Sequence, residues 1–307
     1  MHGRNLISIA DLSADELATL LSTAAQLKRD RSPRALEGKT LALLFEKPSL
    51  RTRVSFDVAM QQLGGHTVYL SQSEVGLGQR EPVADVARVL SRYVEGIAAR
   101  TYAQQTLLDL AEHASVPVIN ALSDDEHPCQ ALADLLTIQE RKGDVRGVRI
   151  AFIGDGNNVA ASLAQASVLA GAHFTIASPP GYRLSEGVLI QLEQFARATG
   201  GSVHLLESPQ EAVEGADVIY TDVWTSMGQE DSYEQRLRAF SAYQVTPELM
   251  ALARPDAIFM HDLPAHRGEE TVDDVIEGPQ SVVFDQAENR LHVQAAVLLL
   301  LLGQVKE

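Results

Sequence analysis

The feature that most constrains the fold is an alternation of short apolar runs with longer segments of helical spacing. The runs are rich in Ile, Val, Leu, Phe and Ala, which is typical of buried strands. They lie at 40–45, 96–100, 148–153, 174–177 and 218–220. Between them, apolar residues recur at intervals that predict helices. Strands alternating with helices favour parallel sheets covered on both faces. We therefore expect an α/β protein with two doubly wound parallel-sheet domains joined by helices.

Two helical segments set the expected domain boundaries in this chain of 307 residues. The helix that carries Ala131 to Ile138 is the candidate junction, so we expect one domain at 1–134 and a second at 135–287. Residues 288–307 contain a helix that is apolar nearly all round, which predicts burial. We expect this C-terminal helix to pack back on the first domain.

Charge and cysteine content limit the possible partners. The formal net charge is −16, which argues against nucleic acid or an anionic membrane as the main partner. Cys129 is the single cysteine, which excludes an internal disulfide and fits a reducing compartment. The N-terminus lacks the apolar core of a signal peptide, and the run from Ala295 to Leu302 is too short to span a bilayer. We expect a cytoplasmic protein that acts on small molecules.

Hydroxyl groups and arginines gather where the first strand gives way to a helix. The segment Ser49-Leu50-Arg51-Thr52 follows the apolar run that ends at Phe45. A helix N-terminus presents free N–H groups and favours an anion, and the guanidinium of Arg51 matches phosphate oxygens. The alternative is an ordinary capped helix with solvated arginines.

A second polar group has the pattern His127-Pro128-x-Gln130 at a strand exit. Proline suits the first turn of a helix and restricts the residue before it, so His127 is held at the helix start. There its ring can donate to a carbonyl oxygen, assisted by Gln130 one turn on. A single histidine is more often structural, so both interpretations remain.

The turn Gly154-Asp155-Gly156 is a weak match to a dinucleotide-binding fingerprint. Val159 stands where the third small residue belongs, and the next strand does not end in an acid for a ribose hydroxyl. The turn instead presents Asn157 and Asn158 at a helix start. Either side chain binds a polar ligand or simply caps the helix.

Two further polar groups follow later strands. Asp222 ends one strand and precedes the segment Ser226-Met227-Gly228, whose glycine permits loop movement over a ligand. The acid is placed to receive an ammonium group; the alternative is an exposed loop around one buried aromatic. His261 and Asp262 follow the strand expected at 257–260. All four polar groups thus lie at strand C-terminal ends, where open α/β sheets bind ligands.

These motifs, in this order and over essentially the whole chain, resemble the aspartate/ornithine carbamoyltransferase family, and its ornithine branch most closely. The resemblance implies that carbamoyl phosphate is bound by Ser49, Leu50, Arg51, Thr52, Arg100, His127, Pro128, Cys129, Gln130, Asp262, Leu263 and Arg290. It implies that ornithine is bound by Asn158, Asp222, Ser226 and Met227. Of these residues, Arg100, His127 and Asp262 are the expected catalytic ones.

The chain departs from the family pattern at two places. Asp262 stands where the ornithine enzymes usually have cysteine, in a His-Cys-Leu-Pro motif, so we expect its charge to slow the reaction. The polar loop at 71–82 has Gly76 where relatives often place glutamine, which leaves Gln79 or Arg80 as substitutes. The resemblance also implies a homotrimer, or a multiple of trimers, in which this loop reaches a neighbouring subunit's site.

The resemblance implies transfer of the carbamoyl group of carbamoyl phosphate to the δ-amine of ornithine, giving citrulline and phosphate. No cofactor and no metal are expected. Three alternatives remain: a carbamoyltransferase with another amine acceptor such as putrescine or a modified ornithine, a nicotinamide dehydrogenase, and a catalytically silent binding relative. The missing third glycine and acid disfavour the dehydrogenase, and Asp262 is the best support for the silent relative.

Overall fold

The computed structural model describes residues 1–30 and 34–303, which form two compact units. Unit 1 comprises residues 1–136 and the described end of the chain from Glu288, and unit 2 comprises residues 137–287. The chain passes from one unit to the other within helices α6 and α13. No helix of the described residues is long and apolar enough to cross a membrane.

Unit 1 is built on a four-stranded parallel sheet in the order β2-β1-β3-β4. Its strands are β1 (Thr40–Phe45), β2 (His66–Ser71), β3 (Gly96–Arg100) and β4 (Val118–Leu122). From β1, the chain adds β2 on one side of this strand and then adds β3 and β4 on the other side. The last residues of β1 and β3, Phe45 and Arg100, are in register across this reversal of direction. The reversal is where open α/β sheets bind ligands.

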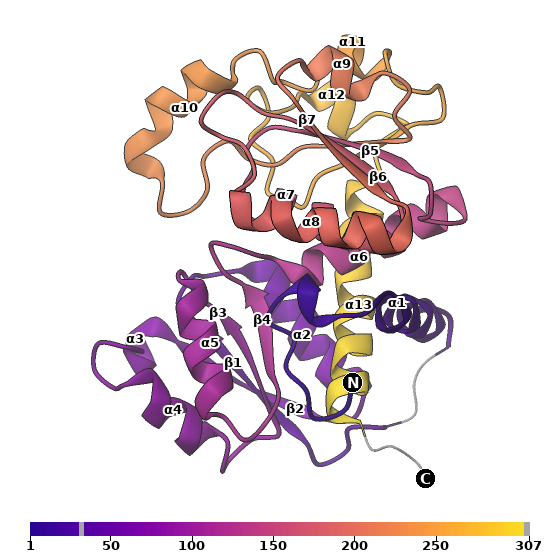
Figure 1. Cartoon of the computed structure of the whole chain (residues 1–307). Helices are drawn as coiled ribbons and strands as arrows, with labels where there is room; N and C mark the ends of the chain where they lie inside the picture. Colours follow the sequence, from indigo (N-terminus) through magenta and orange to yellow (C-terminus); the bar gives the residue numbers. More distant parts are fainter. Residues whose placement is uncertain (31–33, 304–307) are drawn as a thin grey trace. The chain divides into compact units, whose positions relative to one another are not determined.

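Helices cover both faces of this sheet (Figure 1). The helix α1 begins at a capping box formed by Ser13 and Glu16. The elements of unit 1 before the junction are η1 (Ile9–Asp11), α1 (Ala14–Arg29), α2 (Leu50–Gln62), α3 (Gln72–Val75), α4 (Val83–Leu90), α5 (Gln104–His113) and the first part of α6 (Pro128–Lys142).

The C-terminal helix α13 (Val283–Leu302) belongs to unit 1 from Glu288 onward and packs on it, as the sequence predicts. The N–H of Gly3 donates to the carbonyl of Leu301 at 3.0 Å, and the ammonium of Lys39 donates to the carbonyl of Leu302. The apolar face of α13 is buried from Val293 to Leu302 at most positions, which accounts for its low polarity.

Unit 2 is built on a five-stranded parallel sheet in the order β7-β6-β5-β8-β9. Its strands are β5 (Arg149–Ile153), β6 (His173–Ala177), β7 (Ser202–Leu206), β8 (Val218–Tyr220) and β9 (Ile258–Met260). Here the order reverses between β5 and β8, so the segments after Ile153 and Tyr220 leave the sheet side by side. In both units, therefore, the strand order reverses at one place, which we call the switch point, and different residues follow the strands there.

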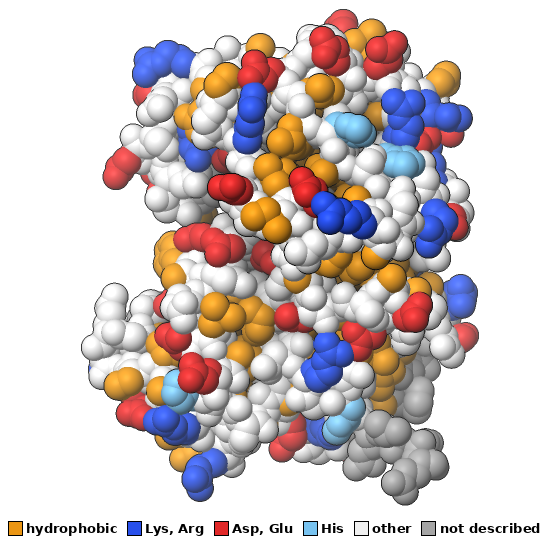
Figure 2. Space-filling model, in the orientation of Figure 1, with side chains coloured by type: hydrophobic (Ala, Val, Ile, Leu, Met, Phe, Trp, Pro, Cys, Tyr) orange, Lys and Arg blue, Asp and Glu red, His pale blue; other side chains and the backbone are white. Residues whose placement is uncertain are grey.

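The elements of unit 2 that flank this sheet include α7, which is buried along its whole length. They are α7 (Asn158–Leu169), α8 (Glu186–Thr199), α9 (Pro209–Val213), η2 (Glu230–Ser232), α10 (Tyr233–Phe240), α11 (Pro247–Met250) and α12 (Asp273–Ile276). Acidic and basic side chains are interspersed on the face of the molecule that Figure 2 shows.

The observed elements differ from the expected ones mainly at their ends. The helix α2 begins at Leu50 rather than Val54, because Ser49 caps it directly after the turn. The strand β4 begins at Val118 rather than Val116, since Pro117 has no N–H to pair. Residues 72–75 of the expected 71–82 loop form the helix α3. The last helix begins five residues before the expected Glu288.

Candidate functional site

Unit 1 presents the start of α2 at its topological switch point. The hydroxyl oxygen of Ser49 accepts a hydrogen bond from the N–H of Thr52 at 3.2 Å, which caps the helix. Leu50 is 76% exposed, while Thr52 is buried and Arg51 is partly buried. The neighbouring Arg53 instead stacks over the ring of Tyr69, 3.7 Å from its centroid. Of the two arginines, Arg51 is the one whose charge acts on His127.

Arg290 of the C-terminal helix joins α2 to α6 inside unit 1. Its Nη2 donates to Oγ1 of Thr52 at 3.1 Å, and its Nη1 donates to Oε1 of Gln130 at 2.6 Å. The amide of Gln130 in turn donates to Oδ1 of Asp134 at 2.9 Å. All four side chains are buried. Residues far apart in the sequence are therefore fixed in one hydrogen-bonded group.

His127 lies at the start of α6 within the field of three arginines. Burial lowers the pKa of this imidazole well below its ordinary value, and the charges of Arg290, Arg100 and Arg51 lower it further. The ring is consequently neutral near pH 7. A buried neutral histidine among three guanidinium groups is an environment that favours an anion. We refer to Arg51, Thr52, Arg100, His127, Gln130 and Arg290 as the anion site.

The two residues that follow His127 begin α6. Pro128 is the first residue of α6, as its fixed φ favours. The thiol of Cys129 is buried and donates to the carbonyl of Asn120 at 3.7 Å, and burial raises its pKa to about 11. The Cys129 side chain is therefore part of the core as a neutral thiol.

Unit 2 brings Asn157 and Asp222 together at its own switch point. Oδ1 of Asn157 accepts from the N–H groups of Val159 and Ala160 and so caps α7, while its Nδ2 donates to Oδ2 of Asp222 at 2.7 Å. Oδ1 of Asn158 accepts from the N–H of Val159 at 3.0 Å. Asn157, which the sequence leaves open between capping and binding, caps the helix and also orients the acid.

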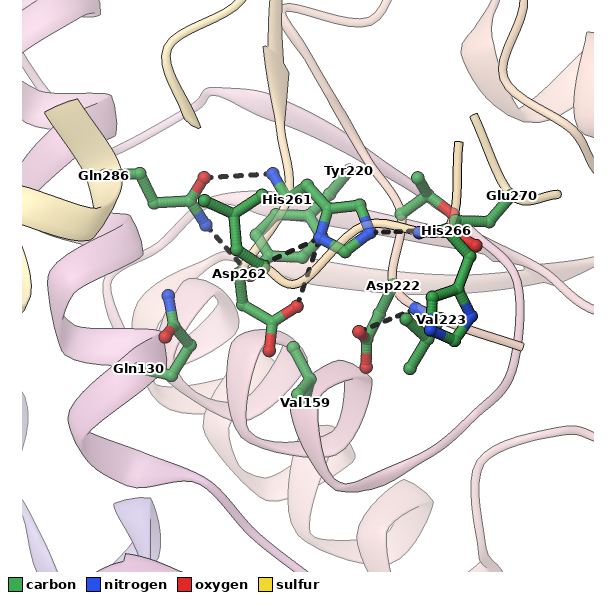
Figure 3. Close-up of polar contacts among 12 residues, drawn as sticks. Gln130, Val159, Tyr220, Asp222, Val223, His261, Asp262, His266, Glu270 and Gln286 are labelled. Atoms are coloured by element: carbon green, nitrogen blue, oxygen red, sulfur yellow. Dashed lines mark hydrogen bonds and ion pairs between the residues drawn. The ribbon is translucent and has the colours of Figure 1, made fainter. Parts of the chain in front are cut away.

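The carboxyl group of Asp262 faces that of Asp222. Figure 3 shows both groups turned toward the same space beside Val159 at the start of α7. Burial raises the pKa of Asp222 well above its ordinary value, and the charge and hydrogen bond of Asp262 raise it further; the charge of His261 and the bond from Asn157 oppose the rise. The two acids therefore act as a pair that holds a proton more tightly than one aspartate does.

A fixed framework holds Asp262 in place. The N–H of His261 donates to Oε1 of Gln286 at 2.9 Å, and Nε2 of Gln286 donates to the hydroxyl of Tyr220 at 3.0 Å. Leu263 has a φ of 59°, which is strained for a residue with a side chain, and its N–H donates to Nδ1 of His261 at 2.9 Å. Strain of this kind is typical of functional turns.

His261 itself lies between acids. Burial would lower its pKa, but hydrogen bonds to Asp262 and Glu270 and the charges of Asp262 and Asp222 raise it to about 10. Its Nε2 is 3.0 Å from Oε1 of Glu270, and its Nδ1 is 3.5 Å from Oδ1 of Asp262. Nδ1 thus has two competing partners: the N–H of Leu263 when the ring is neutral and Asp262 when it is protonated. We refer to Asn157, Asp222, His261 and Asp262 as the acid site.

The segment after Asp222 forms a turn closed by its own hydrogen bonds. The N–H of Gln229 donates to the carbonyl of Ser226 at 3.1 Å, and the N–H of Ser226 donates to Oε1 of Gln229 at 3.2 Å. Met227 is 45% exposed and Gly228 has a φ of 93°. Ser226 and Met227 thus lie at the protein surface on a glycine-containing turn.

Arg236 fixes the base of that turn and carries no motif in the sequence. Its Nη1 donates to Oδ2 of Asp155 at 2.6 Å and to the carbonyl of Trp224 at 2.7 Å. Its guanidinium also lies 5.0 Å from the ring centroid of Tyr182. Burial raises the pKa of Asp155, and Arg236 opposes that rise. In the sequence, this contact is indicated only by the acidic residue Asp155 in the turn after β5.

Sequence reasoning also missed the partners that orient the expected residues: Asp134 for Gln130, Gln286 and Glu270 for His261, and Asn157 for Asp222. Within the part of the chain that the structure describes, two groups of ligand-type side chains also have donor atoms within 4.8 Å of one another: Asp222, His261 and Asp262, and His266, Glu269 and Glu270. Their positions along the chain follow no known metal-ligand spacing, so only the fold reveals them.

Two family models match this chain. The carbamoyl-P binding domain of aspartate/ornithine carbamoyltransferase matches residues 4–140, and the Asp/Orn binding domain of the same family matches residues 146–301. The first match contains all of the anion site except Arg290, and the second contains that arginine and the acid site. The chain belongs to the aspartate/ornithine carbamoyltransferase family, as its motifs indicate.

Individual relatives belong to one branch of that family. A protein of Pyrococcus abyssi named ornithine carbamoyltransferase is 55% identical over 310 residues, covering 100% of this chain and 98% of its own. One of Pyrococcus furiosus, named as the anabolic enzyme, is 54% identical with the same coverage. The crystal structure of ornithine carbamoyltransferase from Thermus thermophilus has a TM-score of 0.89 at 51% identity, with 97% and 98% coverage. That from P. furiosus has a TM-score of 0.96 at 54% identity, with 99% coverage of both chains.

Proposed function

We propose that the protein transfers the carbamoyl group of carbamoyl phosphate to the δ-amine of L-ornithine, giving L-citrulline and phosphate. The observation that carries this proposal is the anion site, where Arg290 joins Thr52 to Gln130 and three arginines surround a neutral His127. The names of the full-length relatives support the acceptor. One of them is named as the anabolic enzyme, which favours a role in arginine biosynthesis.

The anion site binds carbamoyl phosphate in this proposal. Arg51, Ser49 and the first N–H groups of α2 receive the phosphate, because a helix N-terminus and a guanidinium both stabilise a dianion. Arg100 and His127 donate to the carbonyl oxygen, where negative charge develops as the amine attacks. The carbonyl carbon gains a C–N bond, its bond to the phosphate oxygen breaks, and the phosphate leaves with that electron pair.

The acid site binds ornithine and takes the proton that the amine loses. Asp222 receives an ammonium group, while Asn158 and the turn of Ser226 and Met227 contact the amino acid end. Burial and the charge of Asp262 raise the pKa of Asp222, which favours this pair as the acceptor of the proton that the amine loses. Asp262 and Leu263, which the family resemblance also assigns to carbamoyl phosphate, lie in unit 2.

A citrulline assay on the purified protein tests this proposal. With carbamoyl phosphate and equal concentrations of ornithine, putrescine, N-acetylornithine or aspartate, we expect product from ornithine at least about a hundredfold faster than from the others. Faster carbamoylation of putrescine would support the alternative of another amine acceptor. No turnover with any amine, together with saturable binding of carbamoyl phosphate, would support a silent binding relative.

We further propose a cytoplasmic homotrimer, or a multiple of trimers, in which the 71–82 loop completes a neighbour's phosphate pocket. Gln79 and Arg80 are exposed on this loop. The edge strand β2 and the start of α2 also expose apolar side chains, Leu50, Val54 and Val68, which is typical of a surface that pairs with another copy.

Hybrid trimers test the shared pocket. If each pocket needs Arg51 from one subunit and Arg80 from the next, Arg51→Ala and Arg80→Ala should each be inactive. Mixing the two under conditions of subunit exchange should restore part of the activity, because some pockets then contain both arginines. No recovery in hybrid trimers verified by native mass spectrometry would show that the pocket is not shared.

A further inference from the structure

A cluster of His266, Glu269 and Glu270 lies in unit 2 and has no role in the proposed reaction. One donor atom of each side chain lies within 4.8 Å of the others. In Figure 3, His266 and Glu270 are on the side of His261 away from Asp262. The cluster thus adjoins the acid site, because Glu270 contacts His261 on the side of the imidazole away from Asp262.

Each of the two carboxylates in this cluster accepts hydrogen bonds through its Oε1 atom. Oε1 of Glu269 accepts from the hydroxyl of Tyr233 at 2.7 Å. Oε1 of Glu270 accepts from the N–H of His266 at 2.6 Å and is 3.0 Å from Nε2 of His261. Such outer contacts orient the ligands in metal sites, where a second partner fixes each ligand that binds the ion.

The other oxygen of each carboxylate is buried and accepts no hydrogen bond from the described residues. These atoms are Oε2 of Glu269 and Oε2 of Glu270, and the Glu270 side chain is fully buried. Nδ1 of His266 lies 3.6 Å from Oε2 of Glu269. A buried carboxylate oxygen without a donor is costly, whereas a cation bound to it would satisfy it.

We propose that His266, Glu269 and Glu270 bind a divalent transition-metal ion of the Zn²⁺ type. One imidazole nitrogen and two carboxylate oxygens are ligands that Zn²⁺ accepts in proteins. Two atoms bound to one such ion lie at most about 4.2 Å apart, so a small rotation of the His266 side chain closes the set. His266 is 44% exposed, which leaves an open position for water.

The backbone of the cluster is fixed by the fold. The N–H of Glu269 donates to the carbonyl of His266 at 2.9 Å, and the N–H of Gly268 donates to that of Thr271 at 2.7 Å, with a φ of 96° that favours glycine. Tyr233 begins α10, which follows the turn of Ser226 and Met227. Its hydroxyl bond to Glu269 links that helix to the segment after β9, from which all three proposed ligands come.

Titration of the metal-free full-length protein with Co²⁺, and then with Zn²⁺ in competition, tests this site without substrates. We expect one ion per chain, visible as a Co²⁺ absorption band that Zn²⁺ displaces. His266→Ala and Glu269→Gln should each weaken binding at least about tenfold, and His266→Asp should retain it. His292→Ala is the matched control, because it removes the imidazole of another histidine–glutamate pair, 3.7 Å from Glu288, and should change nothing.

Three results would overturn the proposal: no one-to-one binding, equal affinities in the wild type and in a folded His266→Ala protein, or loss of binding in Asp262→Asn but not in His266→Ala. The last result would place the ion at Asp222, His261 and Asp262 instead. Circular dichroism and the melting temperature of each variant separate lost ligands from lost folding. Because citrulline formation plays no part in this titration, its outcome is independent of the proposed function.

Discussion

The anion site of unit 1 and the acid site of unit 2 occupy the same topological position and contain different ionisable groups. In unit 1 the switch point between β1 and β3 carries guanidinium groups around a neutral histidine. In unit 2 the switch point between β5 and β8 carries two facing carboxyl groups. The topology of the sheet thus determines where the site lies. The residues that follow each strand determine whether the site favours an anionic or a cationic ligand.

The two sites also differ in how they are held. Arg290 is bonded to side chains of two other helices, so the anion site is rigid before any ligand binds. The acid site contains a proton shared between like charges and an imidazole with two competing partners. We therefore expect substitutions in unit 1 to act through lost contacts to carbamoyl phosphate, and substitutions in unit 2 to act through the protonation of the paired acids.

The largest expected effect comes from Arg290→Lys. A lysine has one ammonium nitrogen in place of the planar fork, so it does not reproduce the bonds that two guanidinium nitrogens make to the buried Thr52 and Gln130 side chains. We expect kcat/KM for carbamoyl phosphate to fall about a hundredfold, which corresponds to about 2.7 kcal/mol. The KM for ornithine at saturating carbamoyl phosphate should change little. Equal losses for both substrates would remove the distinction between the two sites.

Arg51→Lys should have a smaller effect, since Arg51 is only partly buried. We expect a loss of at least about tenfold in kcat/KM for carbamoyl phosphate, because a point charge does not reproduce the two parallel donors of a guanidinium. Arg53→Lys is the control: it lies two residues away, stacks on Tyr69 and should leave the kinetics unchanged. If both variants behave alike, Arg51 does not contact the phosphate.

Asp262→Asn should alter the pH dependence of stability. The raised pKa of Asp222 means that ionising this carboxyl group is unfavourable in the folded protein. Its contribution to the free energy of unfolding is therefore most stabilising below the ordinary aspartate pKa of about 3.9, and it is lost as the pH rises through the pKa of the folded state. Removing the charge of Asp262 should lessen that loss. Asp262 also stabilises the protonated His261, but that contribution is constant below about pH 6.5, so we expect the melting temperature of the variant relative to the wild type to rise from pH 4 to pH 6.5. A difference independent of pH would contradict the shared proton.

Asp262→Cys should have the smallest effect on rate. From the sequence we expect a carboxylate in place of the family's cysteine to slow the reaction, because it adds negative charge. The structure places it against Asp222, where the pair holds one proton tightly and so resembles one aspartate beside a neutral thiol. We therefore expect kcat/KM for carbamoyl phosphate at neutral pH to rise less than about tenfold in the cysteine form. A larger gain, measured at saturating ornithine, would show that both acids are charged.

The sequence predicts the parallel sheets and the packing of the last helix because both depend on local patterns. The run 40–45 and the segment 96–100 are strands with the expected bounds, since each is apolar and bounded by polar residues. The comparisons confirm the family resemblance. It could be recognised from the sequence because motifs such as Ser49 to Thr52 consist of consecutive residues.

The contacts that orient these residues could not be predicted from the sequence. Arg236 reaches Asp155 across 81 residues, and Arg290 reaches Thr52 across 238. Neither contact follows a periodic pattern or a fixed spacing in the sequence. Each depends on the order of the strands in the sheet, which decides which strand ends become neighbours. For the same reason, the sequence does not predict that the carboxyl groups of Asp222 and Asp262 face each other and share a proton.

The central claim is that the two units bind different substrates, and direct titration of carbamoyl phosphate into the protein without ornithine tests it. Wild type, Arg290→Lys and Asp222→Asn are measured side by side by calorimetry at low temperature, where carbamoyl phosphate lasts longest. We expect Asp222→Asn to bind within about twofold of the wild-type affinity and Arg290→Lys to bind about a hundredfold more weakly, in line with loss of a buried charged donor. Equal weakening by the two substitutions, or none by Arg290→Lys, would contradict the assignment of carbamoyl phosphate to unit 1.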